Sequence, residues 1–216
     1  DDAANVATER WQQAKRTVPF DGRVEFELGL DQLISGDPLG ALETWEIACE
    51  LTPPLRLKIF DLLGPKMPAT ILIERFHPSL DDLIYLERKL RDWKRENQVP
   101  IVRETIVRHL VDRQAAGEEL PPREWDILAR CLLELERTTE AAEQTAAALE
   151  AHPQSFHLKR IRARILFEQG QFAESAEHYR WCLARQPDDE ELELQAKAAI
   201  DAALRVTGNA PGTSIR

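Results

Sequence analysis

The spacing of four prolines constrains the fold of this chain more than any other feature. Pro19 and Pro53 are 34 residues apart, and so are Pro153 and Pro187. A fixed interval of this length is typical of a chain built from repeated supersecondary units, each of which buries its apolar face against its neighbours. The sequence therefore predicts an array of repeats, and 216 residues leave room for several of them.

Counting each proline as position 32 of a repeat defines three segments with a shared pattern: 22–55, 122–155 and 156–189. Small residues recur at positions 8, 20 and 27, namely Gly29, Ala41 and Ala48; Ala129, Ala141 and Ala148; and Ala163, Ser175 and Cys182. Position 24 is aromatic in the first and third segments, Trp45 and Tyr179, but it is Thr145 in the second. Two helices that cross closely need small residues where their backbones approach and large residues where a hole must be filled. The pattern therefore indicates a crossed helix pair in each segment.

This arrangement resembles the tetratricopeptide repeat (TPR) family, whose unit is a helix, a turn and a second helix in about 34 residues. Gly36 and Gly170 stand at position 15, where the first helix ends. The third segment departs from the family at Lys159 and Arg162, where Trp and Leu are usual. The resemblance implies an all-α fold, a right-handed superhelical α-solenoid of TPR-like helix-turn-helix repeats with a degenerate middle section.

The rest of the chain is expected to extend this array. Residues 1–21 place Trp11 at position 24, so they are either the second helix of a truncated repeat or an N-terminal cap. Residues 56–121 read as degenerate helical pairs, in which Ser79 and Asp82 have the spacing of a capping box. Residues 190–206 are expected to form a capping helix with an acidic face, and residues 207–216 a disordered tail.

Composition and motif content argue against several classes of function. A net charge of -10 argues against binding to duplex nucleic acid, and no apolar run is long enough to cross a membrane. The three cysteines, Cys49, Cys131 and Cys182, lack the spacing of a disulfide framework or a zinc site, so we expect them to fill packing space. No motif of a hydrolase, metalloprotease or nucleotide-binding enzyme occurs. We therefore assign no catalytic residue, no metal and no cofactor.

The start of the chain bears on its compartment. The chain begins at Asp1 and its one methionine is Met67. We therefore expect the natural N-terminus to lie upstream, where a targeting segment or a membrane region would fall outside this sequence. The expected compartment is cytoplasmic or periplasmic, and the sequence does not decide between them.

The resemblance also implies where a ligand would bind, because TPR ligands usually contact positions 2, 5, 9, 12 and 13 of the first helix. The candidate groove residues are Arg23, Phe26, Leu30, Arg123, Arg130, His157, Arg160, Arg164 and Phe167. The Lys and Asn set with which chaperone-binding members clamp a C-terminal carboxylate is absent. The arginines predict a surface for carboxylates or other anions, unless they pair with the neighbouring Glu134 and Glu168. Likewise, Phe26 and Leu30 either face a ligand or are covered by the middle helices.

Two functions follow from these observations. The first is a protein–protein interaction scaffold that presents a concave groove to a peptide or partner protein with an acidic segment. The second is a membrane-proximal appendage of a bacterial glycan-assembly protein, because residues 54–80 resemble the helical region that trails O-antigen ligase or polymerase-like proteins. The sequence upstream of Asp1 would separate the two, since a multi-span membrane region there would favour the appendage.

Overall fold

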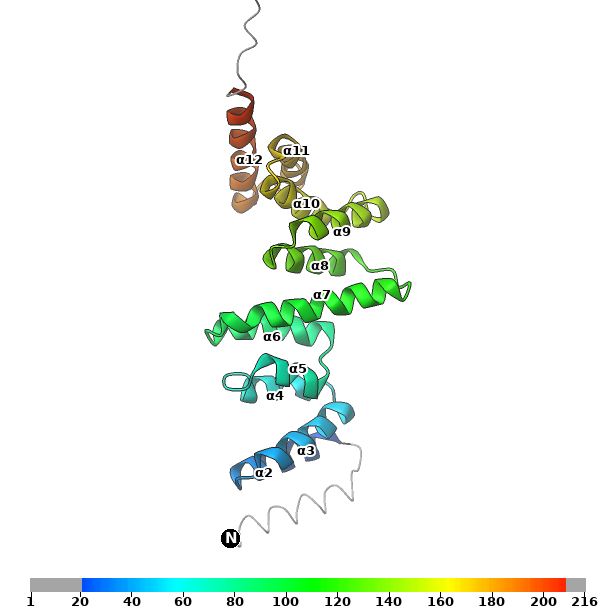
Figure 1. The fold of residues 1–216 in the computed structure, drawn as a ribbon, viewed down its shortest axis with the longest axis vertical. Coiled ribbons are helices and arrows are strands. Elements are labelled where there is room, and N and C mark those ends of the chain that lie inside the picture. Colours follow the sequence, from blue (N-terminus) through cyan, green and yellow to red (C-terminus); the bar gives the residue numbers. More distant parts are fainter. Residues whose placement is uncertain (1–20, 209–216) are drawn as a thin grey trace, which may run out of the picture. The chain divides into compact units, whose positions relative to one another are not determined.

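The computed structural model describes residues 21–208, which form helices and their connections without a β-strand (Figure 1). The part that precedes residue 21, with the predicted truncated repeat or cap, and residues 209–216 of the predicted tail lie outside the described residues, whereas residues 207 and 208, also predicted as tail, belong to the last helix. The helices are α2 (Gly22–Ile34), α3 (Pro38–Leu51), α4 (Leu55–Leu63), α5 (Ala69–Phe76), α6 (Leu80–Asp92), the short η1 (Glu96–Gln98), α7 (Val99–Ala115), α8 (Pro122–Glu134), α9 (Thr138–Ala151), α10 (Phe156–Glu168), α11 (Phe172–Leu183) and α12 (Glu190–Gly208). The chain divides into two compact units between Val102 and Arg103. The predicted all-α class is confirmed.

Three helix pairs repeat the same register. The pairs α2–α3, α8–α9 and α10–α11 begin at Gly22, Pro122 and Phe156, and each first helix is 13 residues long. In every pair the second helix begins 16 residues after the first, at Pro38, Thr138 or Phe172. The two helices of each pair pack directly on one another. The predicted TPR-like helix-turn-helix repeat is therefore confirmed.

Small residues occupy the helix crossings for the expected reason. Ala41 and Ala48 of α3 are fully buried, and a Cβ atom on Gly29 of α2 would clash with the indole of Trp45. In the third repeat the Ser175 hydroxyl donates to the carbonyl oxygen of Ala163 at 2.7 Å. Larger side chains at these positions would push the two helices apart.

The turn between the two helices has the same hydrogen bonds in all three repeats. The amide of Asp37 donates to the carbonyl oxygen of Gln32, and the amides of Arg137 and Gln171 make the equivalent bonds. The preceding residue at position 15 has a positive φ in each case: 88° at Gly36, 61° at Glu136 and 76° at Gly170. This is the Schellman arrangement, in which a left-handed residue ends the helix. Glu136 adopts a left-handed conformation that favours glycine, so the backbone of the second repeat is strained at this residue.

We expect Glu136→Gly to raise the free energy of unfolding by about 0.5–1 kcal/mol, because glycine adopts this conformation without a steric penalty. Urea denaturation followed by far-UV circular dichroism measures the change. The matched variant is Gly170→Ala, at position 15 of the third repeat, where an added Cβ atom would meet no other atom within 4 Å. It should lose about 1 kcal/mol. If both variants were as stable as the wild type, the positive φ at position 15 would not affect the free energy of unfolding.

The middle of the first unit is helical but does not follow the repeat register. Here α4 packs on α6, and α5 packs on α3. The predicted capping box forms at the start of α6, where the amide of Asp82 donates to the Ser79 hydroxyl and the Ser79 amide donates to Asp82 Oδ2. Asp82 also pairs with Arg56 of α4 at 2.5 Å, with both side chains largely buried. This ion pair connects α4 and α6.

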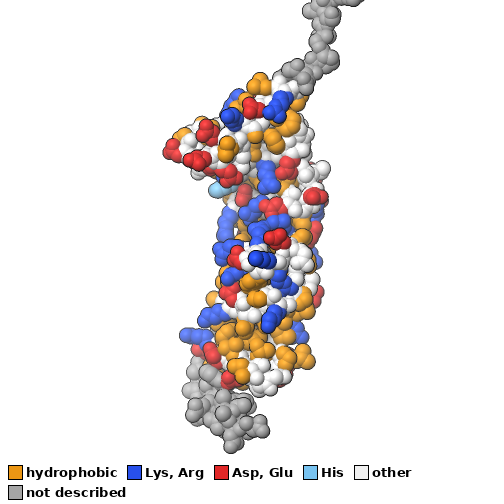
Figure 2. Space-filling view, turned by 90° about the vertical axis from the view of Figure 1, so that its left-hand side faces the viewer, with side chains coloured by type: hydrophobic (Ala, Val, Ile, Leu, Met, Phe, Trp, Pro, Cys, Tyr) orange, Lys and Arg blue, Asp and Glu red, His pale blue; other side chains and the backbone are white. Residues whose placement is uncertain are grey.

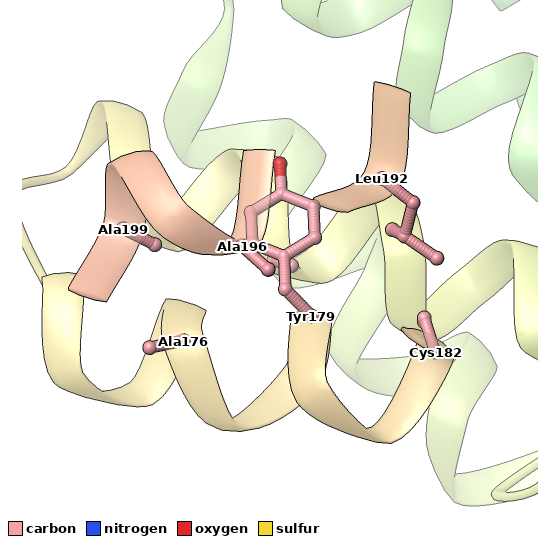
Figure 3. Close-up of a cluster of buried hydrophobic side chains, with 7 residues drawn as sticks. Ala176, Tyr179, Cys182, Leu192, Ala196 and Ala199 are labelled. Atoms are coloured by element: carbon pink, nitrogen blue, oxygen red, sulfur yellow. The ribbon is translucent and has the colours of Figure 1, made fainter. Parts of the chain in front are cut away.

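In the second unit, α12 covers the apolar face of the third repeat. Leu192, Ala196 and Ala199 of α12 pack against Ala176, Tyr179 and Cys182 of α11 (Figure 3). Burial raises the pKa of the Cys182 thiol to about 11, so the thiol stays protonated and acts as a small apolar group. Each helix from α8 to α12 contacts its neighbours in the sequence, as in a solenoid.

Candidate functional site

A pocket of about 360 Å³ opens between α8, α10, α11 and α12 of the second unit. Its lining is Asp126 and Arg130 from α8; His157, Arg160, Ile161 and Arg164 from α10; Tyr179 from α11; and Glu191 and Gln195 from α12. The residues from α8 are four positions apart, and those from α10 are spaced by three and four. Such spacings put side chains on one face of a helix. The repeat register therefore brings cationic side chains of two adjacent first helices into one pocket.

The three arginines of the pocket differ in how their charge is balanced. Arg160 pairs with Asp189 at 3.5 Å and with Glu191 at 3.2 Å, and Arg164 pairs with Glu168 at 3.1 Å. Arg130 makes no hydrogen bond or ion pair with a residue that the structure describes. Its guanidinium, with donors in a planar fork, is therefore available to an anion that enters the pocket.

Two further groups set the electrostatics of the pocket. Burial raises the pKa of the Asp126 carboxyl, and the nearby charges of Arg130, His157 and Arg160 act against this rise. Burial likewise raises the pKa of Tyr179 to about 12, so its hydroxyl remains a neutral hydrogen-bond donor. Tyr179 is 4% exposed, and its hydroxyl points away from α11 (Figure 3). The pocket thus combines cationic forks, a neutral hydroxyl and two carboxylates.

The structure brings four of the nine predicted groove residues into this pocket: Arg130, His157, Arg160 and Arg164. Arg123 is exposed at the start of α8 and does not line the pocket. Phe167 is half-buried, packs against the core under α12, and lies with its ring 5.2 Å from that of Phe172. The predicted pairing of Glu168 with an arginine occurs, whereas Glu134 pairs with Arg103 of α7.

The other three predicted residues belong to α2 in the first unit. Arg23 is exposed and pairs with the helix-capping Asp21 at 3.2 Å. Phe26 is half-buried, with its ring centroid 6.3 Å from that of Trp45 and with the Lys58 ammonium 5.9 Å from its own centroid. Leu30 is also half-buried. The α2 face is therefore partly covered by α3 and α4 and partly open.

Five pocket residues were not among the predicted site residues, and one of them, Ile161, is a buried core residue of α10. Asp126 stands at position 5 of its repeat, so the register could have added it. Tyr179 was assigned to filling the helix crossing, and it performs that role while its hydroxyl end reaches the pocket. Glu191 and Gln195 could not be found from the sequence, because their place depends on how α12 packs on α11.

Comparison with known proteins identifies no family for this chain. No family model matches, and no curated protein matches. One solved structure that is similar is "Crystal Structure of P58(IPK) TPR Domain at 2.5 A", with 12% sequence identity and a TM-score of 0.46. The match covers 97% of this chain and 63% of that chain, so the chain spans less than two thirds of its length.

From residue 21 to residue 208, no helix has the length and apolar character that a membrane span requires. In the same range, no cluster of three or more His, Cys, Asp or Glu side chains is placed to bind a metal ion.

Proposed function

We propose that this chain is a protein-binding scaffold whose arginine pocket receives an acidic segment of a partner protein. The observation that carries the proposal is Arg130, a guanidinium in a pocket with two other arginines and without an ion-pair partner among the described residues. A planar fork of donors matches the two oxygens of a carboxylate. This proposal keeps the prediction from the sequence that the chain is an interaction scaffold and not an enzyme.

The balance of charge in the pocket also favours an anionic ligand. The lining holds three arginines and two carboxylates, Asp126 and Glu191, and Arg160 and Arg164 also pair with Asp189 and Glu168 outside the lining. Of the three arginines, Arg130 alone forms no ion pair with a described residue, in a chain that carries a charge of -10. A partner with scattered acidic residues would be repelled by most of the surface and attracted to this pocket.

The test is isothermal titration calorimetry with a synthetic peptide of about ten residues, rich in Asp and Glu. We expect the wild type to bind it, and Arg130→Ala to weaken the affinity about tenfold or more, because hydrogen bonds to a charged acceptor are lost. Asp126→Asn should strengthen binding about threefold, since it removes a negative charge from the pocket wall. Higher salt should weaken binding by the wild type.

The matched control is Arg180→Ala, which removes an exposed arginine of α11 outside the pocket. It should bind the acidic peptide as the wild type does. A lysine-rich peptide of equal length should not bind. If Arg130→Ala and Arg180→Ala bind the acidic peptide with the same affinity as the wild type, the attraction comes from elsewhere and the pocket is not the site.

The second candidate function, an appendage of a bacterial O-antigen ligase or polymerase-like protein, remains a prediction from the resemblance of residues 54–80. In the structure this segment forms α4, the α4–α5 loop and α5. The test is the coding sequence upstream of Asp1. A multi-span membrane region there would favour the appendage, and further repeats would favour a free scaffold.

A further inference from the structure

An apolar hollow lies in the first unit, where the end of α2 meets α4 and the loop between α4 and α5. Its volume is about 650 Å³, within the range of ligand-binding pockets. The lining residues are Leu33 from α2; Leu62 and Leu63 from α4; Pro65, Lys66, Met67 and Pro68 from the loop; and Ile71 from α5. Lys66 is the one charged residue of this lining. The hollow differs from the arginine pocket in its chemistry, and the two share no residue.

Bulky aliphatic side chains are exposed at and near the hollow. Leu62 is 42% exposed and Ile71 38%, and both line it. Ile34 is 83% exposed and directly follows Leu33 of the lining in α2. Figure 2 shows hydrophobic side chains gathered over α2 to α5 in the lower part of the view, with Lys and Arg side chains beside them. A contiguous apolar patch with a polar rim is typical of a surface that binds another macromolecule.

Hydrogen bonds and close packing hold the loop that forms the wall of the hollow. Arg95 donates to the carbonyl oxygens of Gly64 and Met67, to the latter at 2.6 Å, and the amide of Ala69 donates to Gln98 Oε1 at 2.6 Å. Gly64 is buried against the ring of Trp93, where a Cβ would clash. Pro65 and Pro68 restrict the backbone further. Because the loop is fixed at both ends, a ligand would bind without the entropic cost of ordering it.

The charges around the hollow indicate the sign of its occupant. Lys66 lines the hollow, and Lys58 lies on α4 four residues before Leu62, on the same face of the helix. Neither lysine forms an ion pair with any residue in the described part of the chain. The carboxylate of Asp61, the acidic residue of α4, accepts a hydrogen bond from the Tyr85 hydroxyl at 2.7 Å and pairs with the Lys89 ammonium at 2.9 Å. Leu62 therefore lies near two cations whose charge is not balanced within the described structure.

We propose that this hollow docks an amphipathic segment of a partner protein, with bulky aliphatic side chains that enter the hollow and acidic residues that pair with Lys58 and Lys66. The aliphatic side chains would bury the exposed surfaces of Leu62 and Ile71. The acidic residues would fix the orientation of the segment and disfavour basic segments.

The probe is a leucine–glutamate peptide of about 14 residues with leucines at helical spacing, titrated into the full chain and followed by fluorescence anisotropy. The wild type should bind it. Two comparison peptides, one with Lys for every Glu and one with Ser for every Leu, should each bind at least about tenfold more weakly.

The variants separate the hollow from the rest of the surface. Ile71→Ser and Lys66→Glu both change exposed residues, so the fold should persist, and each should weaken binding about tenfold. The matched control is Leu194→Ser in α12, an aliphatic residue of the second unit that is 68% exposed, and it should leave the affinity unchanged. The same comparison is repeated in an Arg130→Ala background, where the glutamates of the probe gain little from the arginine pocket; a loss of affinity on adding Ile71→Ser there reports on the hollow alone and distinguishes failure of this site from failure of the arginine pocket.

Three results would overturn the proposal. The first is a wild type that does not bind the leucine–glutamate peptide, or binds the lysine peptide equally well. The second is equal affinity of the wild type and Ile71→Ser. The third is a wild type that dimerises in analytical ultracentrifugation while Ile71→Ser stays monomeric, because the occupant would then be a second copy of this chain.

Discussion

Ala41→Arg is expected to unfold the first repeat. Ala41 is fully buried where α3 crosses α2, and the glycine opposite this crossing region, Gly29, already has no room for a Cβ beside Trp45. An arginine there forces the helices apart and places a charge in an apolar interior without a partner. The combined cost should exceed about 4 kcal/mol, which is a large part of the stability of an ordinary domain.

The measurement is the thermal midpoint by far-UV circular dichroism, together with hydrogen exchange of the α2 and α3 amides. We expect loss of protection in α2 and α3, because a repeat depends on contacts with its neighbours. The control is Glu43→Arg, which introduces the same side chain at an exposed position of the same helix. A midpoint of Ala41→Arg equal to that of the wild type would show that position 20 does not lie at a helix crossing.

Trp45→Ala is expected to lower the free energy of unfolding by about 3–5 kcal/mol, the usual cost of a large cavity in a core. Trp45 is 0% exposed, and its indole N–H donates to the carbonyl oxygen of Phe26 at 3.0 Å. Truncation to alanine removes the indole, so the carbonyl oxygen of Phe26 loses this donor and an empty space remains beside Gly29.

Urea denaturation measures this loss, with Leu39→Ala of the same helix as the control. Leu39 is 67% exposed, so its truncation should change stability by less than about 0.5 kcal/mol. A cost for Trp45→Ala below about 1 kcal/mol would place the indole outside the core.

The repeat register could be read from the sequence because it depends on local and periodic features. The 34-residue proline interval and the small residues at the crossings are present in the chain itself, and the structure forms helix pairs in that register. The position 15 turn was partly foreseen: Gly36 and Gly170 predicted it in two repeats. Glu136 gave no such signal, yet the same hydrogen bonds hold it in the same conformation.

The two surfaces were predictable to different degrees. Arg130 and Arg164 share a pocket because both stand at position 9 of adjacent first helices, and Arg160 at position 5 lies one turn earlier on the same face, so their grouping followed from counting. The apolar hollow could not be predicted, because Leu62 and Ile71 lie in the section without register. An aliphatic residue in an amphipathic helix is ordinarily assigned to the core.

The sequence by itself thus determined the helical class and the three helix pairs, since side-chain size at fixed intervals decides how closely two neighbouring helices can cross. Only the tertiary structure decided which charges are balanced and which apolar residues stay exposed. Arg160 pairs with Asp189, Arg130 forms no ion pair with a carboxylate among the described residues, and Ile71 borders a hollow. These outcomes depend on contacts between helices that are far apart in the chain, and no local pattern in the sequence encodes such contacts.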